Sequence, residues 1–204
     1  MVRKPVADAS ARRNRDAEIL EAATAVFAQK RFSGASLQEI ADRVGILKGS
    51  LYHYIESKES LLFRILQLSH AEATAIMASV DELDLPTEEK FRTYVGRLTA
   101  WYLCHLERAG IYQNEWRFLE GAFGSQVRAQ RRSFSGYMRG IIDAAVAEGL
   151  AVPDLDADLA TKFVLSALDS IASWYQTVPA KDIERISAGL TSLAHSTVFA
   201  RAKS

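Results

Sequence analysis

The side chains best suited to chemistry in this chain gather in residues 48–54. This stretch is too short and too polar to form a stable helix by itself, so neighbouring helices must hold it in place. It supplies charge for phosphate, small groups that permit close approach, and rings that offer hydrogen bonds and flat apolar surface. The residues concerned are Lys48, Gly49, Ser50, Tyr52, His53 and Tyr54. Such a set is typical of a segment that contacts DNA.

Two helices that precede this stretch are predicted to position it. Apolar residues at steps of three and four predict a helix over 12–30. A capping box that begins at Ser36 starts a short helix, and Gly45 ends it because glycine readily takes a positive φ. Two short helices joined by a tight turn form a helix-turn-helix, in which the first helix holds the second against the major groove.

The rest of the chain is predicted to be helical as well, so the fold class is all-α with about nine helices. Ser57 is expected to cap a helix that runs to about residue 80, and residues 81–86 are expected to form a loop. Thr87 is expected to cap the next helix. The later helices are predicted over 87–107, 112–120, 124–149, 156–176 and 181–201. We therefore expect a DNA-binding domain over 12–60 and a ligand-binding and dimerisation domain over 61–204.

Composition places the chain among ordinary globular proteins. Of its 204 residues, 49% are apolar and 25% are charged, and the net charge is zero. Residues 1–15 nevertheless hold five basic groups and one acidic group, which suggests that one end of the molecule meets a polyanion. There is no apolar run long enough to span a membrane, and the basic N-terminus has no apolar signal-peptide core. We expect a cytoplasmic protein without a membrane partner.

No residue pattern predicts a catalytic or metal site. The single cysteine, Cys104, cannot form an internal disulfide or a thiolate metal cage. Cys104 and His105 are adjacent, so on a helix they point in different directions and do not form a catalytic pair. We expect neither an enzyme nor a bound cofactor or metal.

Residues 36–62, SLQEIADRVGILKGSLYHYIESKESLL, resemble the TetR family of bacterial one-component regulators. The upstream helix RDAEILEAATAVFAQKRF also matches, so the resemblance covers about residues 12–65. The matching positions include Ile40-Ala41, Gly45, the Tyr52-x-Tyr54 pair and Ser57-Lys58-Glu59. Ile55 departs from the usual phenylalanine, which is a conservative change in the core.

The resemblance implies an Ω-shaped homodimer with a three-helix DNA-binding head, a connecting fourth helix and a ligand domain. The last two helices would pair with those of the partner. By position, Ser36 and Gln38 would contact phosphate or a base. The base-facing residues would be Lys48, Gly49, Ser50 and His53, and the residues that clamp the backbone would be Tyr52, Tyr54 and Lys58.

Several of these residues have ordinary alternatives. Tyr52 and Tyr54 also suit a core, and His53 suits an exposed surface. The arginines of the basic arm, Arg12, Arg13 and Arg15, are either solvated or contact DNA phosphate or the minor groove.

Aromatic residues after position 100 predict the walls of a ligand cavity. Most of them belong to the core, but some should line a cavity between the helices over 87–176. The candidates are Trp101, Tyr102, Trp116, Phe134, Tyr137 and Trp174, with Arg131 as a charged partner. Arg131 belongs to a row with Arg128, Arg132 and Arg139 that is either solvated or binds a phosphorylated or carboxylated ligand.

The expected function is a ligand-responsive regulator, most simply a repressor released from operator DNA by a small apolar molecule. Similarity to a TetR subgroup linked to steroid or fatty-acid catabolism implies an acyl-CoA thioester as that molecule. The alternatives are a multidrug-efflux regulator that responds to aromatic or cationic drugs and, less well supported, a helical enzyme. Small residues on helices 156–176 and 181–201, among them Ala160, Ala167 and Gly189, predict a dimer seam there.

Overall fold

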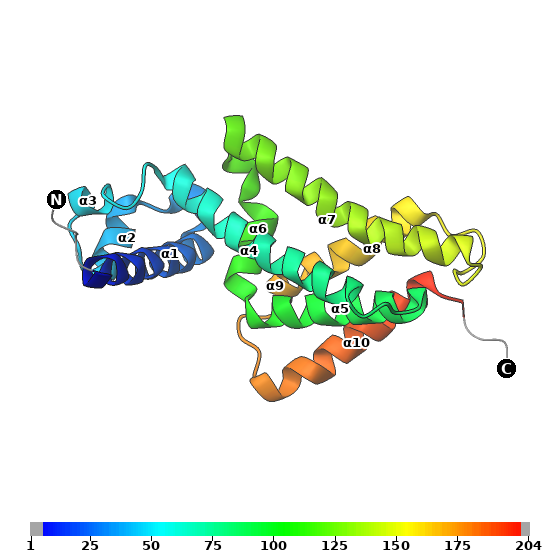
Figure 1. Ribbon diagram of the computed structural model, residues 1–204. Coiled ribbons are helices and arrows are strands. Elements are labelled where there is room, and N and C mark those ends of the chain that lie inside the picture. Colours follow the sequence, from blue (N-terminus) through cyan, green and yellow to red (C-terminus); the bar gives the residue numbers. More distant parts are fainter. Residues whose placement is uncertain (1–5, 201–204) are drawn as a thin grey trace.

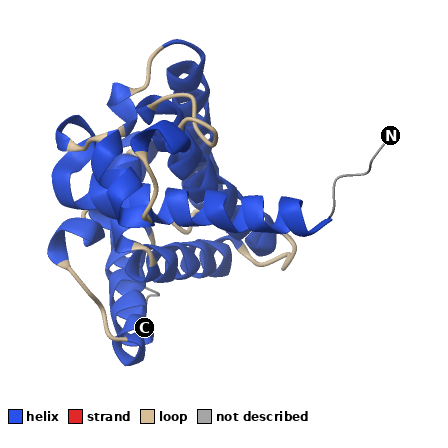
Figure 2. Ribbon diagram, turned by 90° about the vertical axis from the view of Figure 1, so that its left-hand side faces the viewer, coloured by secondary structure: helices blue, strands red, loops and turns tan. Residues whose placement is uncertain are grey.

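The computed structural model describes residues 6–200 and confirms the all-α fold class. Helices α1 to α3 and the turn after α3 form one end of the molecule, here called the head (residues 6–57), and helices α4 to α10 form the effector domain (Figure 1). Helix α4 leads out of the head and runs along the whole effector domain. Figure 2 shows that the N-terminal end of α1 projects beyond the rest of the molecule.

The head follows the predicted order, with two differences in length. Helix α1 spans Val6–Gly34 rather than 12–30, and a break at Arg31 (φ 63°) interrupts it near the predicted end. Helix α2 spans Leu37–Val44 with the capping box of Ser36 and Glu39 in place, and Gly45 takes the left-handed conformation (φ 73°). Helix α3 spans only Lys48–Leu51, and residues 52–54 continue it as turns. The recognition element is therefore a single turn, as its short polar sequence requires.

The apolar core of the head extends into the effector domain. Ile19 and Phe27 of α1, Ile40 of α2, Leu51 of α3 and Leu61 of α4 are all fully buried. The same cluster continues through four buried residues from the effector domain: Ile111, Tyr112, Leu119 and Val127. The head is therefore packed against α6 and α7 of the effector domain.

The effector domain contains seven α-helices and one 3-10 turn within the described range. They are α4 Lys58–Asp81, α5 Thr87–Cys104, α6 Leu106–Asn114, η1 Trp116–Phe118, α7 Gly121–Ala147, α8 Ala157–Asp169, α9 Ile171–Trp174 and α10 Ala180–Val198. Helix α10 packs mainly on α5, and α8 packs mainly on α7. Their core includes Phe91, Tyr94, Leu98, Met138 and Val164.

Several predicted boundaries in this domain are wrong. Thr87 does not cap α5, because Pro86 occupies the capping position and the Thr87 hydroxyl donates to Glu148 at 2.6 Å. The chain turns sharply at His105, so the predicted 87–107 helix ends early and the 112–120 helix becomes α6 and η1. The predicted 156–176 helix is interrupted at Ser170.

The predicted basic arm lies only partly within the described range. Residues 1–5 fall outside it, and Arg12 and Arg13 are exposed on α1. Arg15 is bound within the protein, where its Nη1 lies 2.8 Å from Glu18 and 3.4 Å from the Val44 carbonyl oxygen. Across residues 6–200 no helix combines the length and apolar character needed to cross a membrane.

Two glycines offer a direct test of the α2–α3 turn. We expect Gly45→Ala to lower the free energy of unfolding by about 1–2 kcal/mol, because alanine disfavours φ 73° although the space around it is open. Gly136 lies within α7 with equally open space, so Gly136→Ala is the matched control and should raise stability by up to about 1 kcal/mol. Urea unfolding followed by circular dichroism measures both. Equal effects of the two substitutions would contradict the turn geometry.

Candidate DNA-binding interface and effector cleft

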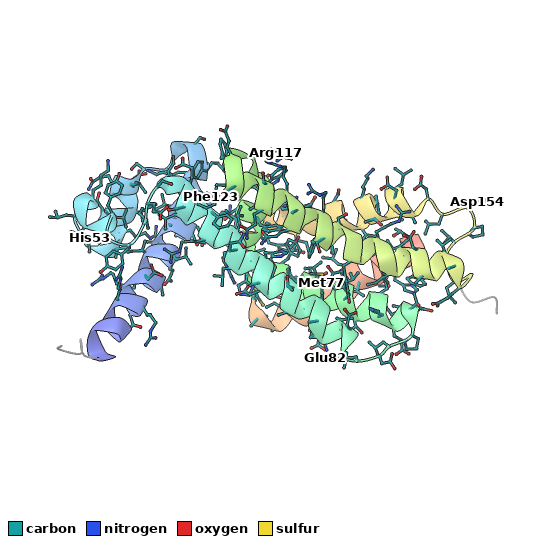
Figure 3. All side chains as sticks on the ribbon, turned by 45° about the horizontal axis from the view of Figure 1, so that its top comes forward. His53, Met77, Glu82, Arg117, Phe123 and Asp154 are labelled. Carbon is teal, nitrogen blue, oxygen red and sulfur yellow. The ribbon has the colours of Figure 1, made fainter. Side chains whose placement is uncertain are left out.

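The outer face of α3 and the following turn presents the predicted DNA-reading residues. Lys48, Gly49, Tyr52 and His53 are exposed, and the Tyr52 side chain has 52% of its surface free. Figure 3 shows His53 at the outer end of the head, away from the effector helices. Nothing lies within 4 Å of the position of a Gly49 β-carbon, so this face is open to close approach.

The opposite face of the same element anchors it to the head. Leu51 and Ile55 are buried, and Tyr54 is half-buried against the same apolar cluster. Tyr54 therefore contacts the core and also keeps part of its side chain exposed, which is compatible with both the core role and the DNA-contact role predicted for it. Ser50 is also only partly exposed.

Three other predicted DNA contacts are occupied by the protein itself. The Ser36 hydroxyl accepts from the Glu39 amide, and the Gln38 side-chain amide donates to Asp42 at 2.7 Å. Lys58 Nζ donates to the Phe32 and Ala35 carbonyl oxygens at 2.8 and 3.0 Å and lies over the Phe32 ring. The Lys58 ammonium group therefore stabilises the turn between α1 and α2, and its contact with phosphate stays a prediction.

A cleft of about 740 Å³ opens where the head meets the effector domain. Its walls come from the end of α1, from α6 and from the junction between α8 and α9. Two arginines, Arg31 and Arg117, line it, and Figure 3 shows Arg117 near the head. Asp169 and Gln113 also line it, so the cleft is markedly polar.

A chain of hydrogen bonds runs from the effector core to this cleft. Arg131 donates to the Gln113 side-chain oxygen at 3.3 Å, and Gln113 donates to the Tyr102 hydroxyl at 3.4 Å. Tyr102 then donates to Asp169 Oδ1 at 2.6 Å. Burial raises the pKa of Asp169, whereas the Tyr102 hydrogen bond and the nearby Arg131 charge oppose that rise. The chain ends in an acceptor at the edge of the cleft.

A buried carboxylate connects the same region to the head. Glu115 follows α6 and has only 3% of its surface exposed. It accepts a hydrogen bond from the Phe32 amide at 3.1 Å, and Arg31 Nη1 lies 3.5 Å from it. The break in α1 at Arg31 turns this amide toward the effector domain, so α6 and the head are joined by hydrogen bonds as well as by the shared core.

A larger hollow of about 1090 Å³ lies on the other side of the α1–α6 contact. Leu20 and Ala25 of α1, the corner between α5 and α6, and Val178 line it. None of the predicted ligand residues lines this hollow, and none lines the cleft.

Comparison with known proteins agrees with this architecture. Residues 19–65 match the family described as bacterial regulatory proteins of the tetR family. Residues 84–198, more than half of the chain, match the tetracycline repressor-like C-terminal domain. The chain belongs to the TetR family. Its members are DNA-binding transcriptional regulators that respond to small molecules, and homodimers are typical of them.

Individual TetR-family relatives are distant but cover most of the chain. The transcriptional repressor KstR2 of Rhodococcus jostii is 26% identical over 86% of this chain and 87% of its own length. The repressor NicS of Pseudomonas putida is 30% identical over 70% of this chain and 68% of its own length.

Solved structures share the fold. The ketosteroid transcriptional regulator KstR2 of Mycobacterium tuberculosis superposes with a TM-score of 0.85 at 23% identity, covering 92% of this chain and 96% of that one. AibR, solved with isovaleryl coenzyme A and operator DNA, gives 0.77 at 22% identity, covering 88% and 97%.

The predicted ligand residues of this TetR protein separate into two groups. Tyr102 and Arg131 belong to the hydrogen-bond chain behind the cleft, and Trp116 lies beside Arg131 with 5.1 Å between guanidinium and ring. The others lie away from the cleft: Trp101 donates to Glu72, Phe134 is buried in the core, Tyr137 donates to Asp81, and Trp174 is 53% exposed. The expected aromatic cavity therefore stays a prediction.

The predicted arginine row is also divided. Arg131 points into the domain and donates to the Tyr112 carbonyl oxygen at 3.0 Å. Arg139 is paired with Asp143 and Asp158, and Arg128 donates to Ser125. Three of the four arginines thus contact different neighbours, and Arg132 is exposed on α7, so the predicted row does not gather at the cleft.

The sequence reasoning missed the residues that line the cleft. Asp169, Gln113, Arg31 and Arg117 come from four separate segments. Asp169 lies opposite the apolar face predicted for the 156–176 helix, so helical periodicity contains no signal that could have found it.

Lys48 of α3 and Lys58 at the start of α4 should behave differently. We expect Lys48→Ala to weaken operator binding by about 1–3 kcal/mol and to reduce the salt dependence by about one phosphate contact, because Lys48 is exposed on the reading face. Lys58→Ala should mainly lower the unfolding temperature, since its ammonium group binds two carbonyl oxygens. Fluorescence anisotropy at several salt concentrations, combined with thermal unfolding, separates the effects. The reverse pattern would contradict this assignment.

Proposed function

We propose that this protein represses transcription as a homodimer that leaves its operator when an acyl-CoA thioester binds to the effector domain. The observation that carries the proposal is the cleft shared by the head and the effector domain, at which the Arg131–Gln113–Tyr102–Asp169 chain ends. Similarity to the KstR2 repressors and to AibR, solved with isovaleryl coenzyme A and operator DNA, supports a thioester as the effector.

The position of the cleft suggests how a ligand would act. Arg31 and Arg117 are available at its wall for the phosphate groups of coenzyme A, as charge-assisted contacts. The carboxylate of Asp169 is suited to an amide or hydroxyl hydrogen of the ligand. Since Glu115 at the end of α6 contacts Arg31 and Phe32 of the head, a ligand that prefers a displaced α6 would change the spacing of the two recognition elements and release the DNA.

A second candidate effector is a cationic apolar compound. Asp169 favours it, because a carboxylate at the wall of a cleft attracts a positive charge. Three arginines oppose it, since the Arg131 charge acts on Asp169 and Arg31 and Arg117 line the same cleft. The thioester is therefore the better supported of the two.

The dimer is proposed to form through α8 and α10. Leu159 and Phe163 of α8 are 62% and 61% exposed, and Leu193 of α10 is 67% exposed. Of the small residues predicted for this seam, Ala160 faces the core with 7% exposure, whereas Gly189 is exposed on α10. An apolar face of this kind is suited to an interface of more than about 1,200 Å².

The effector assignment can be tested by operator retardation. Isovaleryl coenzyme A should release the DNA, whereas free isovaleric acid and the cation tetraphenylphosphonium should not. Arg117→Glu should raise the thioester concentration needed for half-release by about tenfold, because it reverses a charge at the cleft.

Arg132→Glu, an exposed position of α7 away from the cleft, is the matched control and should leave the response unchanged. Release by the cation but not by the thioester would favour the efflux-regulator alternative.

A single charged substitution on α8 tests the proposed dimer seam. Phe163→Arg should convert the dimer to a monomer in sedimentation, because an unpaired guanidinium would be buried at the seam. Leu83→Arg, at a 46% exposed leucine of the α4–α5 loop, is the control and should remain dimeric. A dimeric Phe163→Arg protein would place the seam elsewhere.

A further inference from the structure

Leu47, in the turn just before α3, exposes 79% of its surface. Among the large apolar side chains of the described residues it is the most exposed. A single exposed leucine is common on protein surfaces and by itself needs no explanation. This leucine differs in its position, because it adjoins the exposed face formed by Lys48, Gly49, Tyr52 and His53.

The fold makes no use of the Leu47 side chain. Its neighbour Ile46 packs against the head core, whereas Leu47 points away from it. Only the backbone of Leu47 takes part in starting α3, since its carbonyl oxygen accepts from the Ser50 and Leu51 amides at 2.9 and 3.3 Å. The side chain makes no capping hydrogen bond at a position where serine, threonine, aspartate or asparagine is favoured. The leucine therefore has no evident structural reason to be there.

The major groove provides one apolar group for such a side chain to contact. Each base pair presents hydrogen-bond donors and acceptors there, but thymine alone among the four bases adds a methyl group. Tyr52 also offers ring surface, but Leu47 is wholly apolar and more exposed, with 79% against 52% of its surface free, so it is the residue best suited to that methyl group. Contact would also remove the leucine from water, which favours binding.

We propose that Leu47 is a specificity-determining residue that reads a thymine methyl group in each half-site of the operator. The proposal rests on the DNA-binding function of the head and goes beyond it, because it assigns a base and an atom. It makes the operator preference depend on an apolar contact in addition to the polar contacts of Lys48 and His53.

The test uses DNA that differs only in the methyl group. An operator duplex is first selected from random DNA with the wild-type protein, and each thymine is then replaced in turn by deoxyuridine in both half-sites. At one thymine per half-site, the wild-type protein should lose about fourfold in affinity per half-site, the effect of one methyl group removed from an apolar contact. Replacement of the other thymines should have little effect.

Variants assign the effect to the side chain. Leu47→Ala and Leu47→Ser should bind the thymine and uracil duplexes equally, and Leu47→Ser can also cap α3, which keeps the head folded. Leu83→Ala makes the same change at an exposed leucine outside the head and should keep the wild-type discrimination.

Uracil discrimination that persists in both Leu47 variants would overturn the proposal, as would a selected operator without a methyl-sensitive thymine. Failure of the wild-type protein to select any DNA would instead contradict the DNA-binding function itself, and the proposal would fall with it.

Discussion

The shared apolar core of the head and the effector domain is the constraint on which the rest of this structure depends. Phe27 and Leu61 lie in the same cluster as Ile111 and Val127, so the head cannot rotate without disturbing α6 and α7. Glu115 reinforces this contact from its nearly buried position by accepting from the Phe32 amide. A buried carboxylate without hydrogen bonds raises the free energy of the folded state. Separation of the end of α6 from the break in α1 would therefore be unfavourable, because Glu115 would lose its hydrogen bond from Phe32.

This constraint explains why a cleft beside α6 is well placed for regulation. Its lining residues Phe27 and Arg31 belong to the head, whereas Gln113 and Asp169 belong to the effector domain. A ligand there would contact both the head and the effector domain. If it binds one arrangement of these two parts more tightly than another, it also changes the affinity of the protein for DNA. The inward chain that ends at Asp169 adds chemical selectivity, since each of its groups donates toward that carboxylate.

The sequence predicted the head with good accuracy because its local signals are strong. The capping box at Ser36, the left-handed glycine at 45 and the cap at Ser57 depend on neighbours within three residues, and each is present in the structure. The exposed Lys48 and His53 and the buried Leu51 follow from the same short pattern. The Thr87 cap failed because its hydroxyl found a distant partner in Glu148.

By itself, then, the sequence determined the all-α class, the helix-turn-helix and its exposed reading face, because capping, turn chemistry and helical periodicity act within a few residues. Tertiary structure alone decided the roles of side chains whose partners are remote: Lys58 binds the α1–α2 turn, Arg139 pairs with Asp158, and Trp174 faces outward. It also brought Asp169 to Tyr102 across 67 positions of the chain. The physical reason is that hydrogen bonds and ion pairs depend on distance in space, which no local pattern specifies.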